Sequence, residues 1–166
     1  MLQPILHRTQ APKGKTPLLY ESISHSRLSV ISAVSLSPKR QKLSLFWKIQ
    51  SYNFTAEDLI DFLRRLRKSI PSKITLIWDR YSVHKKVLKE YSKRHQNLIK
   101  VEWLPTYAPE LNPTEGVWRH TKYNQLPNTA PFDLVELNCQ LKGSLGYIKS
   151  QQYLLRSFFK KAGLVL

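Results

Sequence analysis

The sequence has almost no cysteine and no long apolar run. Cys139 is the single cysteine among 166 residues, so neither an internal disulfide nor a cluster of thiolate metal ligands is available. No segment approaches the roughly 20 consecutive apolar residues that span a bilayer, and the first ten residues lack the apolar core of a signal peptide. We therefore expect a soluble protein of a reducing, cytoplasmic compartment, with no membrane partner.

Acidic residues are also scarce. Eleven Asp and Glu stand against 27 Lys and Arg, which gives a formal net charge of +16. This charge exceeds what solubility requires and favours a polyanionic partner, with nucleic acid first. A ribosome-associated protein, a binder of membrane surfaces and a generally basic proteome are the alternatives that composition leaves open. The chain also has no glycine-rich phosphate loop.

The chain is long enough for one sizeable core, and we predict a single domain over residues 1–166. Residues 27–38 and 41–52 are β-branched and apolar runs separated by a short turn, which predicts two adjacent antiparallel strands. From Thr55 the apolar residues recur at helical spacing, and this helix should end before Pro71. Its predicted buried face consists of Leu59, Phe62, Leu63 and Leu66.

The next run, residues 73–79, is nearly continuous in apolar residues and ends on Asp79. It predicts a strand that is buried on both faces and opens onto a site at its carboxyl end. A helix is expected over residues 82–94 and a strand over 99–103. Three further helices follow, one with Asn112 as its cap and Pro113 at its first position, one from about residue 133 and one over about 150–163. This order predicts an α/β sheet with its polar site at the strand ends.

Asp79 and Glu115 are the candidate catalytic acids. Cleavage and transfer of phosphodiesters commonly rest on two divalent ions, and carboxylate oxygens hold such ions, so about three acids should converge. Asp79 has the alternative of simply ending a strand. Glu115 lies three residues after Asn112 and has the alternative of closing a capping box. Glu110, in the proline-rich approach, is interpreted as a surface or capping acid.

The side chains near these acids have two interpretations each. His84 would contact phosphate, orient Asp79 or lie on a solvated helix face, and the pattern alone favours the solvated face. Three tryptophans would stack on bases or pack in the core, and their apolar surroundings favour the core: Trp78, Trp103 and Trp118.

Two motifs together resemble a known family. "WDRYSVHKK" followed by "LPTYAPELNPTEGVW" resembles the second and third catalytic segments of mariner-related insertion-sequence transposases of the DDE superfamily (insertion sequence 630 type). Asp79, His84, Glu115 and Trp118 stand where that family has its Asp, His, Glu and Trp. The upstream runs "RTQAPKGKTPLLY" and "SRLSVISAVSLSP" resemble the family as well, with Gln10 where a Trp is usual.

The resemblance implies an RNase H-like α/β fold, a mixed sheet flanked by helices. It also implies that a first Asp joins Asp79 and Glu115 to hold two Mg²⁺ or Mn²⁺ ions for cutting and joining transposon ends. The implied partners are DNA, both transposon ends and target, and further copies of the chain in a homo-oligomer on DNA. The implied location is the bacterial cytoplasm, at the nucleoid. Residues placed to contact nucleic acid are Arg80, His84, Lys85, Lys86, Arg119 and Lys122.

Two departures from the family pattern matter. Arg80 replaces the usual Asn and would either grip phosphate or weaken metal binding. The family's first Asp lies on a strand just before a segment like "MLQPILHRTQAPKG", and Glu21 is the one acid among residues 1–56. We therefore expect an N-terminally truncated catalytic domain without its first strand and DNA-recognition helices, inactive alone, with unpaired strand edges that promote association.

An upstream chain that supplies the first Asp is one variant of this hypothesis. A non-catalytic basic DNA-binding protein and another RNase H-like nuclease are the alternatives from other functional classes.

Overall fold

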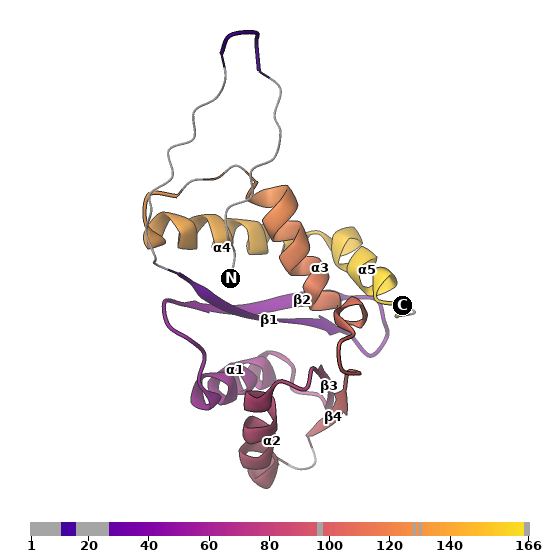
Figure 1. Ribbon diagram of the computed structural model, residues 1–166. Coiled ribbons are helices and arrows are strands. Elements are labelled where there is room, and N and C mark those ends of the chain that lie inside the picture. The colour runs from indigo at the N-terminus through magenta and orange to yellow at the C-terminus, as the bar shows by residue number, and fades with distance from the viewer. Residues whose placement is uncertain (1–10, 16–26, 96–97, 128, 130, 165–166) are drawn as a thin grey trace. The chain divides into compact units, whose positions relative to one another are not determined.

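The computed structural model describes residues 11–15, 27–95, 98–127, 129 and 131–164. The chain forms two compact units. One combines residues 1–52 with 113–166 and is called here the discontinuous unit; the other, residues 53–112, is the continuous unit. The positions of the two units relative to each other are not determined, so each is described by itself (Figure 1).

The discontinuous unit is built on an antiparallel hairpin. Strands β1 (Ser29–Leu36) and β2 (Leu43–Gln50) pair from Ser29 opposite Gln50 to Leu36 opposite Leu43. Arg40 adopts a left-handed conformation (φ 53°) in the connecting turn. This hairpin confirms the two strands predicted from their β-branched runs.

Three helices pack on this hairpin: α3 (Pro113–His120), α4 (Leu134–Ser150) and α5 (Gln152–Lys161) (Figure 1). Asp133 caps α4, because its side chain accepts a hydrogen bond from the Glu136 amide at 2.7 Å. The side-chain amide of Gln152 donates to the Leu43 carbonyl at 2.9 Å and accepts from the Leu43 amide at 3.0 Å, which attaches α5 to β2. The core comprises Leu43, Leu45, Val117, Leu145, Ile148, Leu154, Leu155, Phe158 and Phe159.

The continuous unit contains a helix followed by a β-α-β segment. Helix α1 (Ala56–Ser69) is followed by β3 (Ile74–Trp78), α2 (Ser82–His95) and β4 (Ile99–Trp103). Strands β3 and β4 are parallel, with Trp78 opposite Trp103, so their carboxyl ends meet at one edge. A complete capping box at Thr55 starts α1, and its buried face is the predicted one, with Ile60 added.

The structure corrects one prediction about β3. We expected a strand buried on both faces, but Thr75 and Ile77 are exposed, and Ile77 retains 50% of its surface. The reason is the small sheet: among the described residues β3 pairs with β4 alone and β1 with β2 alone, which gives two two-stranded sheets in place of one continuous sheet. Alternate side chains of such a strand therefore face different surroundings.

Two short elements were not predicted. A 3₁₀ turn, η1 (Pro109–Leu111), precedes α3, and a π-helical segment, η2 (Thr121–Gln125), follows it. In the part of the chain that the structure describes, no helix is both long enough and apolar enough to cross a membrane.

Candidate active site

Asp79 lies at the carboxyl end of β3, immediately after the last residue of the strand. The Tyr81 amide donates to its Oδ1 at 3.0 Å, a local turn in which the aspartate side chain binds the backbone two residues ahead. The Asp79 side chain nevertheless keeps 56% of its surface exposed. One carboxylate oxygen is thus fixed while the group as a whole faces solvent.

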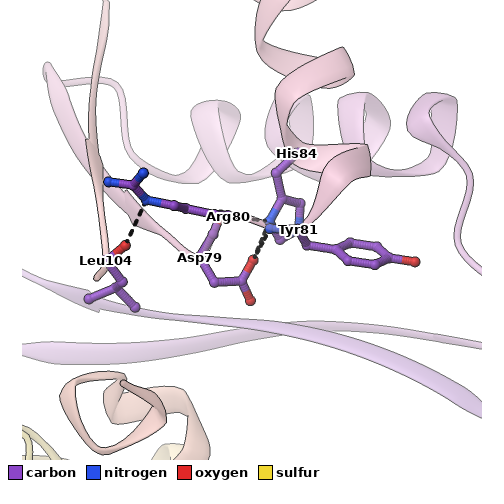
Figure 2. A network of polar contacts seen from close by, with 5 residues as sticks. All are labelled: Asp79, Arg80, Tyr81, His84 and Leu104. Atoms are coloured by element: carbon purple, nitrogen blue, oxygen red, sulfur yellow. Dashed lines mark hydrogen bonds and ion pairs between the residues drawn. The ribbon is translucent and has the colours of Figure 1, made fainter. Parts of the chain in front are cut away.

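His84 also holds this carboxylate. Its Nδ1 lies 2.7 Å from Asp79 Oδ1 and 3.3 Å from the Asp79 carbonyl oxygen, and the side chain is only 12% exposed (Figure 2). The imidazole stacks on Trp78 with ring centroids 4.0 Å apart and planes at 17°, and the Tyr81 ring meets it edge-on at 5.6 Å. The solvated helix face that the pattern favoured for His84 is wrong, because five residues of strand end, turn and helix start bring the ring back over Asp79.

Arg80 extends from the strand end toward the following strand. Its Nε donates to the carbonyl oxygen of Leu104, the residue after β4, at 3.3 Å (Figure 2). The Leu104 amide in turn donates to the Trp78 carbonyl at 2.8 Å. Both contacts attach the loop after β4 to the end of β3, and they hold the exposed Arg80 guanidinium next to Leu104 (Figure 2).

Two lysines lie near the start of α2, whose first turn has no acidic residue. Lys85 and Lys86 are both exposed and follow His84 directly. A helix start with its free amide groups and adjacent cations favours anions. Three exposed basic residues thus follow Asp79 within seven positions of the chain: Arg80, Lys85 and Lys86.

Glu115 lies in the first turn of α3, in the discontinuous unit, and its side chain is exposed. The next residue, Gly116, makes the close approach of α3 to α5: a Cβ built there would lie 2.8 Å from Phe158 Cδ1 and Cγ. Val117 and Phe158, which belong to the core, fix the buried side of α3. The helix that carries Glu115 is thus held by packing rather than by its own eight residues.

The other predicted contacts on this unit lie beyond Glu115. Arg119 is exposed in the last turn of α3, and the Lys122 ammonium lies 5.7 Å from the centre of the Tyr123 ring. His120 contacts Gln125 through their side-chain nitrogens at 3.3 Å. Burial, and secondly the charge of Lys161, lowers the pKa of His120. His120 is therefore more readily neutral than an exposed histidine.

The donor chemistry of Asp79 fits a hard divalent cation. Its Oδ1 is oriented by two donors, and orientation by neighbouring hydrogen bonds is typical of carboxylate ligands. Glu115 offers a second exposed carboxylate. Among the described residues no group of three or more His, Cys, Asp or Glu side chains gathers closely enough to hold a metal ion.

A family model described as DDE superfamily endonuclease matches residues 2–137, a range that includes Asp79 and Glu115. The chain belongs to this endonuclease family. No curated protein gives a significant match to this DDE-family chain.

The fold of this DDE-family chain is similar to that of a chain in the crystal structure of the Mos1 strand transfer complex. The TM-score is 0.55 at 9% sequence identity, over 99% of this chain and 52% of that chain. This likeness confirms the predicted RNase H-like α/β class, and the DDE-family chain spans about half the length of the Mos1 chain.

Sequence reasoning missed three residues around the site. The backbone amide of Tyr81 donates to the Asp79 side chain. The tendency of an aspartate to bind the amide two residues ahead could have indicated this contact. Gly116 permits the approach to Phe158, and a glycine inside a helical pattern was its signal. Tyr107 adopts a left-handed backbone conformation, and nothing in its local sequence indicates that.

Proposed function

We propose that this chain is part of the catalytic domain of a transposase of the mariner-related insertion-sequence group, and that it takes part in metal-dependent cleavage and joining of transposon DNA ends. The observation that carries the proposal is the geometry of Asp79 within a DDE-family chain. Its carboxylate ends a strand, is oriented by Tyr81 and His84, and remains more than half exposed. The fold's likeness to a chain of a strand transfer complex supports the same reading.

In this proposal Asp79 and Glu115 are ligands of Mg²⁺ or Mn²⁺. Such ions, when bound, activate the attacking oxygen and stabilise the leaving oxygen of the phosphodiester. His84 and the Tyr81 amide keep the Asp79 carboxylate in one orientation, so that no reorganisation is needed on binding. Arg80, Lys85 and Lys86 neutralise phosphates of the DNA strand beside that carboxylate.

A third acid is needed for such a site, and we propose that it comes from outside the described residues or from another chain. The three-acid requirement supports this, together with the scarcity of acids before Asp79, since Glu21 is the one acid among residues 1–56. The chain alone should then bind DNA and Mn²⁺ but cleave slowly or not at all, and further copies or an upstream chain would complete the site on DNA.

Metal titration tests this function. Calorimetry with Mn²⁺ should show at least about a tenfold weaker affinity in Asp79→Asn and in Glu115→Gln. Asp61→Asn is the matched control, since Asp61 is an exposed carboxylate that pairs with Arg65 on α1 at 3.0 Å. Affinity unchanged by both site variants would overturn the metal role. Robust, Asp79-dependent cleavage of DNA by the chain alone would instead overturn the need for a third acid from elsewhere.

The second candidate is a non-catalytic DNA-binding protein whose acids are structural. The net charge of +16 favours it, because phosphate contacts alone would account for that charge. It predicts DNA affinity that falls steeply with salt and is indifferent to Mn²⁺.

A further inference from the structure

Tyr107 is an exposed aromatic residue with an unfavourable backbone conformation. It lies in the loop between β4 and η1 with φ of 58°, in the left-handed region. Its side chain is 101% exposed, so the ring contacts essentially nothing in the protein. Among the described residues, Arg40 is the one other non-glycine residue with positive φ, and it stands in a hairpin turn.

The folded protein gains nothing from a tyrosine at this position. For a bulky side chain a positive φ is a real outlier, whereas glycine or asparagine adopts this conformation readily. A buried ring would offset that cost by removing apolar surface from water, but the Tyr107 ring is fully solvated. Neither backbone preference nor packing accounts for the residue, and strained residues of this kind concentrate where a ligand binds.

The loop holds Tyr107 in a defined place. Before it, the Leu104 amide donates to Trp78 and the Leu104 carbonyl accepts from Arg80. After it, the Leu111 amide donates to the Ala108 carbonyl at 3.2 Å and the Asn112 amide to the Pro109 carbonyl at 3.0 Å. These contacts anchor the chain on both sides of the ring.

The ring also lies close to the proposed cleavage site along the same sheet edge. Leu104 is anchored to the residue before Asp79, and three residues of extended chain span at most about 10 Å between Leu104 and Tyr107. One DNA strand advances about 3.4 Å per nucleotide. Tyr107 is therefore within about three nucleotides of a phosphate bound near Leu104.

We propose that Tyr107 is a stacking residue for an unpaired DNA base next to the cleavage site. The proposal rests on the proposed function for its DNA substrate. Aromatic rings stack on any base that is out of the duplex, and bases are accessible where a strand is cut, frayed or bulged. The cations Arg80, Lys85 and Lys86 of the same unit bind the flanking phosphates, which is why a nucleic acid fits this surface better than an apolar protein segment does.

Binding by the full chain in EDTA tests this inference without any cleavage. The probes are a short duplex with one bulged 2-aminopurine and the same duplex fully paired. Tyr107→Asn removes the ring and suits the left-handed backbone, and Tyr107→Phe keeps the ring. Tyr52→Asn is the matched control, because Tyr52 is another exposed tyrosine (58%) that lies outside the continuous unit.

We expect Tyr107→Asn to bind the bulged probe about 5- to 100-fold more weakly and the paired probe within about twofold of the parent. Tyr107→Phe and Tyr52→Asn should match the parent, and 2-aminopurine fluorescence should be quenched by the parent and not by Tyr107→Asn. Equal losses on both probes, or no loss on either, would overturn stacking.

Thermal melting separates stacking from a role inside the protein. Tyr107→Asn should melt at the same temperature as the parent or slightly higher, since it relieves backbone strain. A fall of several degrees, or a changed oligomeric state, would show that the ring covers a protein surface and would overturn the inference. The metal titration stands apart from both measurements: unchanged Mn²⁺ affinity in Asp79→Asn would remove the proposed metal role and leave the stacking result as it is.

Discussion

Replacing Gly116 by alanine should destabilise the discontinuous unit relative to the same replacement at Gly143. The added methyl at Gly116 would lie 2.8 Å from two ring carbons of Phe158, and Phe158 is only 5% exposed, so α3 or α5 must shift. Overpacking of this kind costs about 1–3 kcal/mol. Alanine in place of glycine inside a helix gains about 1 kcal/mol. The net change for Gly116→Ala is therefore a loss of about 0–2 kcal/mol.

Gly143 provides the control within the same unit. It lies inside α4, and a Cβ built there meets no atom within 4 Å. Gly143→Ala should stabilise the unit by the full difference in helix propensity between alanine and glycine, about 1 kcal/mol, without an overpacking cost. The difference between the two variants isolates the overpacking cost, which we expect to separate their urea midpoints by about 1 M.

Urea unfolding followed by tryptophan fluorescence measures this difference. Trp47 and Trp118 belong to the discontinuous unit, so a background with Trp78→Phe and Trp103→Phe reports on that unit alone. Adding Phe158→Leu to Gly116→Ala should cost less than the sum of the two separate losses, because the smaller side chain makes room for the methyl. If Gly116→Ala and Gly143→Ala stabilise the unit equally, the proposed close approach of α3 to α5 is refuted.

Three further predictions concern a cap, a positioning residue and pH. Thr55→Ala should lower the free energy of unfolding of the continuous unit by about 1 kcal/mol because it removes the capping box of α1, and Thr55→Ser should be nearly neutral; a urea titration that follows Trp78 and Trp103, with Trp47 and Trp118 replaced by Phe, measures both. His84→Phe keeps a ring against Trp78 but loses the contact with Asp79. The Mn²⁺ affinity should therefore fall about 10- to 100-fold in calorimetry, with little change in melting temperature. Unchanged Mn²⁺ affinity would refute a positioning role for His84. Burial first, and the charge of Lys161 second, lowers the pKa of His120 in the folded protein. As the pH falls, His120 is therefore protonated in the unfolded chain, near its ordinary pKa of about 6.5, before it is protonated in the folded protein. The stability that neutral His120 contributes is present above that pH and is lost as the pH falls through it toward the folded pKa, so the urea midpoint should decline on acidification, and less so in His120→Gln.

The elements of the fold were predictable where local chemistry sets their ends. Helices were predicted from Thr55, from Pro113 and from about residue 133, and α1, α3 and α4 begin at or next to these positions, with the Thr55 and Asp133 side chains as the caps of α1 and α4. The exposure of β3 was not predictable in this way. The sequence pattern shows that Ile77 is apolar and belongs to a strand. The exposure of Ile77 depends on how many strands lie beside β3, which is a property of the whole sheet.

The family was predictable from the residues around Asp79 and Glu115, whereas the contacts around Asp79 were not. Asp79 and Glu115 were identified from the residues before and after them, and the family match covers both. That Asp79 and Glu115 ligate metal together stays a prediction. The position of His84 against Asp79 depends on the turn through Arg80 and Tyr81, and the left-handed backbone of Tyr107 depends on anchors at Leu104 and Ala108. These are tertiary constraints, which residue type alone does not encode.

The discontinuous unit has a consequence for the order in which the chain folds during synthesis. The Leu43 backbone bonds Gln152, 109 residues later, and the core residues Leu43 and Leu45 pack with residues of α3, α4 and α5, which leave the ribosome after the continuous unit. At about 5–20 residues per second the hairpin waits roughly 5 to 20 seconds for those helices. The continuous unit lies wholly within that interval and can fold first. The nascent chain therefore exposes the apolar face of the β1–β2 hairpin during this interval, and a chaperone that binds such faces would act on β1 and β2 before α3, α4 and α5 cover them.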